Sequence, residues 1–516
     1  MLDYKIIGGQ VFDGTSADPV RSDVGITGER IAAVGDLGPA AAAAVIDAAG
    51  KYVAPGFIDA HSHSDAYLLI EPSAPSKLFQ GITTEVVGNC GASAAPLADA
   101  AYLPSDWRDQ TYPGTWRSVA DYRRLLEQAR PAPNVMLLIG HGKLRAWVMG
   151  YQSRAATADE RRAMARLLEQ GLNEGARGFS TGLIYPPGLF AEAGEIADLA
   201  HMTARYDGIY TTHMRSEGEN LLEAIEETLA IARQTGVRLE ISHLKTSGRG
   251  NWSKADAALE LIRRARAAGV DVAADRYPYT AGGTDLDVIL PDWAQAGGRD
   301  AVLRRLRDPG ERARLRQEMT ASRLADDWKG VVIGSTAEVS FRGKSLPDIA
   351  QALGVDAIEA ALRLMESDEL KTSAFFFGMS EDNMWKILAE PFVMLGSDAS
   401  LRSLQGPLSR DFPHPRAYGA FPKFLRAALD GKTVALSEAI RKMTSLPADH
   451  FRLKGRGRVA AGAYADLVVF DPNTVADRAT FAVPHALARG IDFVMVNGVP
   501  TLDRNGLTGR RAGQIL

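Results

Sequence analysis

Cysteine is nearly absent from this sequence, which contains Cys90 and no other among its 516 residues. A chain with a single thiol forms no internal disulfide, so nothing in the composition indicates an oxidising compartment. A lone cysteine is most often a small buried apolar residue. Other residues must decide whether Cys90 has a chemical role.

Long apolar runs and a strong charge excess are absent as well. No stretch approaches the roughly 18 uninterrupted apolar residues of a membrane span, and the first five residues include no basic region that leads into an apolar one. The formal net charge is only −4, which favours neither nucleic acid nor an anionic membrane as a partner. We therefore expect a cytoplasmic protein that acts on a small molecule. No pattern in the sequence determines its oligomeric state.

The two ends of the chain share one pattern. Short β-like runs broken by Gly, Asp and Pro fill residues 4–50, and similar runs return after Gly455 at 457–471 and 491–497. Neither region contains helical stretches between its runs. We therefore expect residues 1–51 and 455–516 to combine into one small β-sandwich.

The middle of the chain, residues 52–454, alternates β runs with amphipathic helical stretches such as 158–174 and 220–235. This alternation is typical of βα units around a parallel sheet. The predicted strands are 53–59, 82–88, 134–140, 176–180, 209–213, 238–243, 270–275 and 393–397. Eight such strands predict an α/β fold of the closed (β/α)8 type, which the length easily accommodates.

One gap between predicted strands is too long for a single crossover. An insertion at about residues 281–345 is rich in Arg, Asp and Glu, with a helical pattern around 299–319. On the C-terminal face of a barrel such an insertion commonly shapes or covers the active site. Its charges are typical of a solvated surface.

The first predicted strand of the middle region stops at Asp59-Ala60-His61-Ser62-His63. Because side chains alternate along a strand, His61 and His63 project from one face, shared with Asp59, and both rings can reach one cation. Two histidines alone are weak evidence for a metal site. The other strand ends must therefore be considered.

Further candidate ligands occur at those strand ends. Cys90 follows the second strand within Gly88-Asn89-Cys90-Gly91, His213 and His243 end the fifth and sixth, and Asp398 follows the eighth. Active sites of barrel enzymes are built at this edge, which argues against coincidence. The remaining histidines, which form no comparable series, are His141, His201, His414, His450 and His485.

With these residues the chain resembles the amidohydrolase superfamily of metal-dependent hydrolases. The resemblance covers almost the whole chain and includes the stretches 56–63 and 461–470 together with His213, His243 and Asp398. Many members bridge two metals with a carbamylated lysine after the fourth strand, but residues 175–182 contain no lysine. The D-aminoacylase (N-acyl-D-amino-acid deacylase) family uses a cysteine after the second strand instead, and Cys90 matches that pattern. Residues 181–188, 242–245 and 277–280 also look like that family.

The resemblance implies a ligand set. Cys90, His213 and His243 would hold one zinc ion tightly and leave a position for water, whose pKa the metal lowers towards roughly 7. The residues His61, His63 and Asp398 would surround a second, weaker position. Asp398 also suits a proton shuttle between the attacking water and the leaving nitrogen.

The substrate side is predicted from Lys245. It lies two residues beyond His243, so an extended backbone would aim its ammonium into the same pocket, towards a substrate carboxylate. The resemblance assigns this role to Lys245 with help from a tyrosine, for which Tyr185 and Tyr279 are the candidates. A tyrosine hydroxyl could instead polarise the scissile carbonyl.

Two motifs of other enzyme classes do not fit their required context. Residues 178–182 satisfy the Gly-x-Ser-x-Gly pattern of a serine hydrolase with Ser180 as nucleophile, but Leu183-Ile184-Tyr185-Pro186-Pro187 cannot promptly start the helix that must follow. Gly343-Lys344-Ser345 ends like a phosphate-binding loop, yet residue 338 is Glu rather than Gly.

We therefore expect an enzyme, a zinc-dependent amidohydrolase that cleaves N-acyl-D-amino acids to a carboxylate and a free D-amino acid. The preference for the D hand comes from the resemblance, and the preferred side chain and acyl group stay open. One alternative is a cyclic amide or imide hydrolase similar to hydantoinases and dihydroorotases, against which the missing lysine counts. Another is a scaffold with a structural zinc, which should be closed by four protein ligands.

Overall fold

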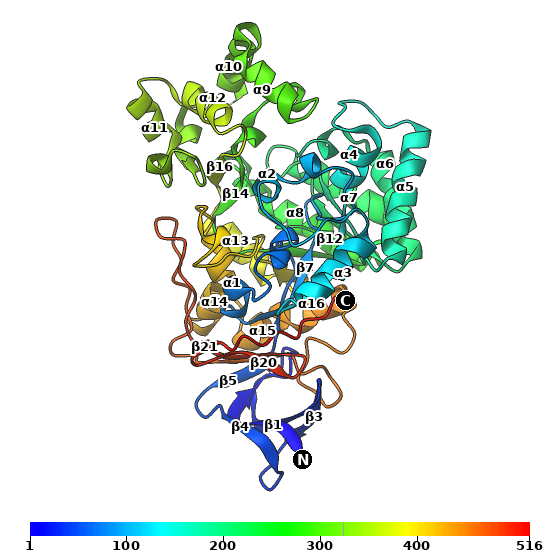
Figure 1. The fold of residues 1–516 in the computed structure, drawn as a ribbon, viewed down its shortest axis with the longest axis vertical. Coiled ribbons are helices and arrows are strands. Elements are labelled where there is room, and N and C mark those ends of the chain that lie inside the picture. Colours follow the sequence, from blue (N-terminus) through cyan, green and yellow to red (C-terminus); the bar gives the residue numbers. More distant parts are fainter. Residues whose placement is uncertain (323–324) are drawn as a thin grey trace.

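In the computed structural model, which describes residues 1–322 and 325–516, three units are stacked along the long axis (Figure 1). A sheet that contains strands from both ends of the chain lies at one end. Parallel strands surrounded by helices form the middle. A smaller unit carrying helices α9 to α12 lies at the other end.

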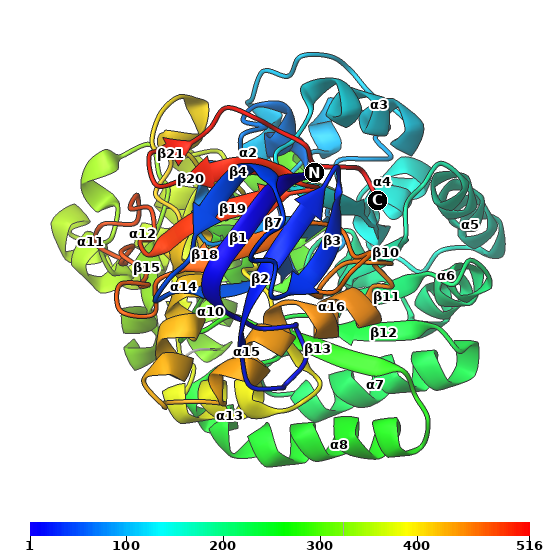
Figure 2. The same cartoon turned by 90° about the horizontal axis from the view of Figure 1, so that it is seen from below.

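The terminal sheet has nine strands in the order β21-β20-β19-β18-β5-β1-β2-β3, with β4 paired to β1. Their bounds are β1 (Leu2–Val11), β2 (Val20–Thr27), β3 (Arg30–Gly35), β4 (Ala42–Asp47), β5 (Tyr52–Pro55), β18 (Leu467–Phe470), β19 (Ile491–Val496), β20 (Val499–Asp503) and β21 (Gly506–Leu507). Strand β18 pairs antiparallel with β5, Val469 opposite Val53. The two ends of the chain therefore share one sheet, which faces the viewer in Figure 2.

Each of the eight predicted strands of the middle region overlaps an observed strand. The observed bounds are β6 (Phe57–Asp59), β7 (Ile82–Val87), β8 (Asn134–Leu137), β9 (Ile139–Gly140), β10 (Gly178–Gly182), β11 (Ile209–His213), β12 (Arg238–Ile241), β13 (Val272–Arg276) and β17 (Val393–Leu395). They form two parallel sheets, β6-β7-β8 and β17-β13-β12-β11-β10-β9. The hydrogen-bonded ladders of the described residues thus do not join into one closed sheet.

The prediction of a single strand over 53–59 was wrong, because the run divides at Gly56. Strand β5 before it belongs to the terminal sheet, and β6 after it pairs with β7. A Cβ at residue 56 would lie 2.2 Å from the Thr83 hydroxyl oxygen, so only glycine permits this close approach. The terminal sheet therefore extends to Pro55, past the expected limit at residue 51.

Helices cover the parallel strands (Figure 2). Their bounds are α1 (Pro75–Leu78), α2 (Ser105–Arg108), α3 (Val119–Ala129), α4 (His141–Met149), α5 (Ala158–Asn173), α6 (Ala193–Arg205), α7 (Leu221–Thr235), α8 (Ala255–Ala267), α13 (Glu381–Ala389), α14 (Arg416–Leu429), α15 (Leu436–Met443) and α16 (Ser445–His450). Helix α5 starts with a capping box between Thr157 and Glu160 and buries Met164 and Leu168 in the main core. The helical predictions at 158–174 and 220–235 therefore match α5 and α7.

The insertion forms a unit with its own core. Strands β14 (Ala281–Asp285), β15 (Val331–Ile333) and β16 (Ser373–Phe377) make an antiparallel sheet, and the helices are α9 (Arg299–Arg307), α10 (Pro309–Ser322), α11 (Leu346–Leu353) and α12 (Ala357–Ser367). Leu306, Leu315, Ile349 and Leu362 pack in a cluster separate from the main core. The segment predicted as an insertion, 281–345, is the first part of this unit, which continues to Phe377.

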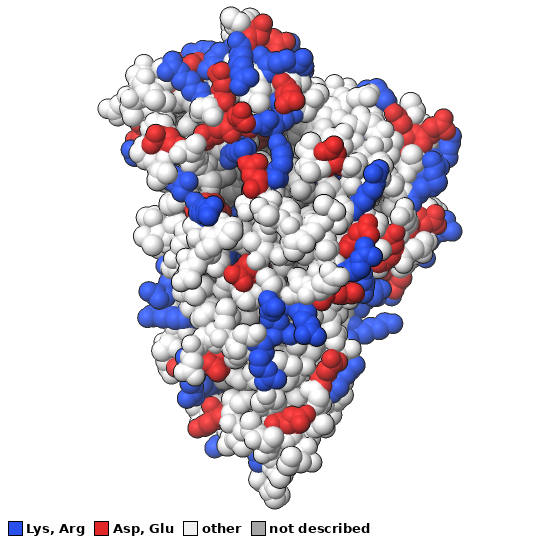
Figure 3. Space-filling model, viewed as in Figure 1, with Lys and Arg blue, Asp and Glu red and all other residues white. Residues whose placement is uncertain are grey.

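Charged side chains gather on the outer surface of this insertion unit (Figure 3). Arg312 pairs there with Glu359 at 2.9 Å, and Glu359 also accepts from Arg363 at 3.0 Å. The first pair links helices α10 and α12 of the unit, and the second lies within α12. Among the described residues, no helix is both long and apolar enough to cross a membrane.

Candidate metal centre

The six predicted ligands converge at one edge of the parallel strands. Two groups bring their ligand atoms within 4.8 Å of one another, namely His61, His63, Cys90 and Asp398, and Cys90, His213 and His243. Cys90 belongs to both groups. Its thiol lies 3.4 Å from Nε2 of His61, 3.4 Å from Nε2 of His243 and 3.9 Å from Nδ1 of His213.

A tight turn presents Cys90 at this position. Gly88, Cys90 and Gly91 all have positive φ, at 87°, 53° and 74°. A Cβ on Gly88 would lie 2.2 Å from the carbonyl oxygen of Leu138. The glycines on either side of Asn89-Cys90 are therefore required by the turn that carries the ligand.

Three of the six candidate ligands have a left-handed backbone conformation. The φ angles are 53° for Cys90, 38° for His243 and 50° for Asp398. This conformation is unfavourable for residues with a Cβ, and it concentrates at functional sites. The backbone strain therefore coincides with the ligands.

The electrostatics of the site favour a thiolate. Burial opposes ionisation, but the positive charge on His61 and His243 holds the pKa of Cys90 well below its usual value. One thiolate among imidazoles is a donor set for zinc and related transition metals, and not for magnesium or calcium. The residues present therefore fit a metal ion of that kind.

Two carboxylates behind the ligands orient the imidazoles. Asp275 lies 3.0 Å from Nδ1 of His61 and accepts the backbone amide of His243 at 3.0 Å. Glu217 lies 2.8 Å from Nδ1 of His243. Such partners fix which ring nitrogen faces a metal. Neither was predicted, although Asp275 ends a predicted strand as several ligands do; Glu217 sits in a loop without any periodic signal.

Asp398 connects the ligands to a buried arginine. Its Oδ1 lies 3.2 Å from Nε2 of His63, and its Oδ2 lies 2.7 Å from Nη1 of Arg416. Burial opposes ionisation, but Arg416 and His243 hold the pKa of Asp398 well below its usual value. Arg416 is 6% exposed, and its Nε atom has no hydrogen-bond partner. It comes from α14, and no sequence pattern pointed to it.

A buried lysine holds together the strand ends that carry the candidate ligands. The Lys77 ammonium, 0% exposed, donates to Asp59 at 2.8 Å, to Ser397 at 3.1 Å and to the carbonyl of Ala399 at 3.0 Å. Asp59, which shares a strand face with His61 in the sequence, therefore supports the site from behind.

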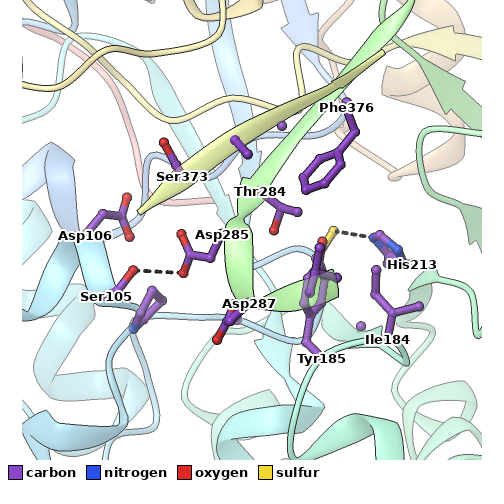
Figure 4. A pocket seen from close by; sticks show the side chains of 18 of the residues that line it. Ser105, Asp106, Ile184, Tyr185, His213, Thr284, Asp285, Asp287, Ser373 and Phe376 are labelled. Atoms are coloured by element: carbon purple, nitrogen blue, oxygen red, sulfur yellow. Dashed lines mark hydrogen bonds between the residues drawn. The ribbon is translucent and has the colours of Figure 1, made fainter. Parts of the chain in front are cut away.

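The ligands open into a large pocket of about 3050 Å³ between the parallel strands and the insertion unit. Thr284, Asp285 and Phe376 of the insertion unit form part of its wall (Figure 4). Asp285 accepts a hydrogen bond from Ser105 at 2.9 Å, which joins the unit to helix α2 in the segment after β7. The expectation that the insertion shapes the site agrees with this arrangement.

The predicted substrate contacts lie at different places. Lys245 lines the pocket and pairs with Glu217. Tyr185 also lines it, with its ring centre 5.0 Å from that of His213 (Figure 4). Tyr279 does not line the pocket, because the backbone turns after Arg276 and directs its ring against His414, 5.2 Å away.

Tyr277 takes the place expected for Tyr279. It lines the pocket, with the Arg416 guanidinium 4.6 Å and the Lys245 ammonium 5.9 Å from its ring centre. The Arg276 guanidinium lies 4.1 Å from the same ring centre, so three cations surround one buried tyrosine.

Ser180 has a structural role in this arrangement. It is fully buried, donates to the carbonyl of Gly88 and accepts from the amide of Gly91 at 3.0 Å. Both bonds hold the turn that presents Cys90. Ser345, from the other discarded motif, caps helix α11 through the amide of Asp348.

The candidate ligands, a thiol with imidazoles and a carboxylate at the ends of parallel strands, form the kind of donor set that a metal-dependent hydrolase needs. Residues 44–502 match the amidohydrolase family, and the chain belongs to that family. Within it the chain is similar along its full length to two enzymes of Alcaligenes xylosoxydans xylosoxydans. It is 40% identical to N-acyl-D-glutamate deacylase, covering 100% of this chain and 96% of the relative, and 39% identical to D-aminoacylase, covering 100% and 97%.

A solved structure of a deacylase is also similar to the chain along its full length. The N-acyl-D-glutamate deacylase of Bordetella bronchiseptica, complexed with zinc and a phosphonate inhibitor, matches with a TM-score of 0.86 and 38% identity over 100% of this chain and 99% of that chain. The resemblance to the D-aminoacylase family, predicted from the sequence, is confirmed.

Replacement of the shared thiol tests the metal centre. We expect Cys90→Ala to lose bound zinc and activity together, because the variant removes a ligand from both groups. Metal content after dialysis measures this, with circular dichroism to verify folding. Ser247→Ala, in the same pocket but outside both groups, should keep its zinc. Full zinc content in Cys90→Ala would reduce the cysteine to a packing residue.

A second prediction concerns pH. Burial and the neighbouring carboxylates of Asp287 and Asp106 raise the pKa of Asp285 from 3.8 to about 8. The folded state therefore binds this proton more tightly than the unfolded state, and it loses stability as pH rises between those two values. The Asp285→Asn side chain cannot ionise. The melting temperature of this variant should therefore rise relative to that of the wild type as pH rises.

Melting curves across this pH range give the measurement. The exposed Asp300→Asn serves as the control and should track the wild type. A constant difference between Asp285→Asn and the wild type at all pH values would contradict the prediction.

Proposed function

We propose that the protein is a zinc-dependent deacylase that hydrolyses the amide bond of N-acyl-D-amino acids to a carboxylate and a free D-amino acid. The observation that carries the proposal is the convergence of Cys90, His213, His243 and Asp398 in one pocket. The relatives named for this reaction are similar over the full length of the chain. Residues 175–182 contain no lysine, which continues to count against the cyclic amide alternative.

The metal assignment follows from the two ligand groups. We assign one tight zinc to Cys90, His213 and His243, and a second, weaker position to His61, His63 and Asp398 beside the shared thiolate. A zinc ion held there would polarise the scissile carbonyl and make a water molecule more acidic.

Asp398 is assigned the proton transfers. Burial opposes its ionisation, but the buried Arg416 beside it lowers the pKa of Asp398 and keeps it a carboxylate that can accept a proton. It takes a proton from the attacking water and later delivers one to the leaving nitrogen, so the carboxylate is regenerated in each cycle. Its contacts with His63 and Arg416 restrict the side chain to one orientation.

The substrate carboxylate is assigned to the wall made by Lys245, Arg416 and Tyr277. The ammonium of Lys245 is shared with Glu217, whereas the buried Arg416 has an unpartnered Nε donor. A planar guanidinium suits a carboxylate better than a point charge does. We therefore extend the predicted anchor, Lys245, to include Arg416, and keep Tyr185 at the scissile amide beside His213.

We also propose the finer architecture expected from the sequence. The backbone amide of Asp398 donates to the carbonyl of His61 at 2.8 Å, which supports closure of the eight strands into a (β/α)8 barrel that begins at β6 and continues to residue 454. A core of Ile6, Val24, Val469 and others within the terminal sheet supports the expected sandwich of the two chain ends, with its first part extended from residue 51 to Pro55 and its second part at 455–516. The cytoplasmic location, expected because the sequence shows neither a long apolar run nor a basic region that leads into an apolar one, stays a prediction.

The proton shuttle makes a quantitative prediction. We expect Asp398→Asn to keep the tight zinc while kcat falls on the order of 10²-fold or more, the scale of lost general acid-base catalysis. Zinc content and steady-state kinetics measure the two effects separately. Near-normal turnover would remove Asp398 from the mechanism.

A substrate panel tests the reaction itself. N-acetyl-D-amino acids should be hydrolysed faster than their L counterparts, because the reactive centre and the carboxylate anchor fix two points and the hand at Cα decides where the side chain goes. N-acyl amines without a carboxylate should be poor substrates. Faster turnover of the L series, or equal turnover without the carboxylate, would contradict the proposal and leave the metal centre intact.

A further inference from the structure

Glu217 lies between a metal ligand and a substrate anchor. Its Oε1 atom is 2.8 Å from Nδ1 of His243 and forms a short ion pair with Nζ of Lys245. The ammonium of Lys245 also lies 2.8 Å from Nδ1 of His243. The three groups therefore form a closed triangle.

The loop that carries Glu217 is held rigidly after β11. Its carbonyl accepts the amide of Ser247 at 2.7 Å, which ties it to the loop that carries His243 and Lys245. Arg215, two residues earlier, makes a bidentate pair with Glu227 of α7 at 3.0 and 3.1 Å. These two contacts fix the backbone on either side of Glu217, so its carboxylate points towards His243 and Lys245.

Two hydrogen-bond donors of the triangle, the ring of His243 and the ammonium of Lys245, compete at Nδ1, and only the Glu217 carboxylate can accept from both. Nε2 of His243 faces the Cys90 thiol, so a neutral ring that offers Nε2 as a ligand must carry its proton on Nδ1. An ammonium has only donors and cannot accept that proton. Glu217 accepts from both His243 and Lys245, so the two donors need not compete.

We propose that Glu217 is a positioning residue that selects the metal-binding tautomer of His243 and keeps Lys245 from donating to Nδ1. Without the carboxylate, Lys245 would donate to Nδ1 and the ring proton would move to Nε2, where it blocks the ligand position. Glu217 thus couples the metal centre to the carboxylate anchor. The anchor half of this inference rests on the proposed function; the tautomer half does not.

Asp275 provides an internal comparison. It accepts from Nδ1 of His61 at 3.0 Å, as Glu217 accepts from Nδ1 of His243. Asp275 has no lysine beside it within ion-pair distance among the described residues, whereas Glu217 does. The competition between two donors is therefore specific to the His243 side.

The test uses Glu217→Met, which keeps the length of the side chain without an acceptor. Zinc affinity, measured without substrate against a competing chelator, should fall about 10- to 100-fold, the usual effect of losing such a partner. Glu217→Gln, which keeps one acceptor oxygen, should lose less. Glu219→Gln, an exposed carboxylate on the same loop, should bind zinc as the wild type does.

The double variant Glu217→Met/Lys245→Met separates the tautomer role from simple packing. With the ammonium gone, Nδ1 can keep its proton, so most of the zinc affinity lost in Glu217→Met should return. A double variant as weak as Glu217→Met, or wild-type affinity in Glu217→Met, would overturn the inference. If Glu217→Met does not fold, Glu217→Gln with and without Lys245→Met gives the same comparison.

The kinetic readout tests the coupling to the anchor. Lys245→Met should raise KM for N-acetyl-D-amino acids, whereas Glu217→Gln, reloaded with zinc, should raise KM and lower kcat together. A change in kcat alone would contradict the coupling. If the wild type hydrolyses no N-acyl-D-amino acid, the proposed function fails, while the zinc titrations still decide the role of Glu217.

Discussion

The arrangement of the site depends on one buried charge. Lys77 holds Asp59 on β6 and Glu85 on β7 and reaches Ser397 after β17. Strands β6 and β17 meet at a seam that the sheet ladders do not bridge, whereas β6 and β7 belong to one sheet. Ser62, which also bonds Lys77, lies between His61 and His63, and Ser397 precedes Asp398. Because breaking a buried ion pair costs about 3–5 kcal/mol, ligands from the two ends of the parallel region are kept in register by this lysine.

Most of the candidate metal centre could be predicted because strand ends leave a local trace in the sequence. Period-two alternation paired His61 with His63, and the turn around Cys90 needs its glycines, so both features are visible in a few residues of sequence. The partners behind the ligands leave no such trace. Glu217 meets His243 from a different loop, and Arg416 reaches Asp398 from a helix, so their pairing exists only in three dimensions. The exchange of Tyr279 for Tyr277 depends on the direction of one turn, which an extended-strand assumption cannot give.

The fold was predictable to a similar depth. Alternating β and helical patterns located every parallel strand of the described residues, because short buried runs alternate there with amphipathic helical stretches. The pattern did not tell which sheet an apolar run joins, so the division at Gly56 was missed. The limit of the insertion was placed too early because its charged composition ends before its last strand, β16, whose apolar residues resemble an ordinary core strand.

The separate core of the insertion unit has an evolutionary consequence. Leu306, Leu315, Ile349 and Leu362 stabilise that unit without the main core, while Thr284, Asp285 and Phe376 face the pocket from it. Every candidate metal ligand belongs to the middle unit, at the ends of the parallel strands. Substitutions on the pocket side of the insertion can therefore change which side chains are admitted while the reactive centre keeps its geometry. One scaffold can in this way diverge into a set of enzymes that share a reaction and differ in substrate.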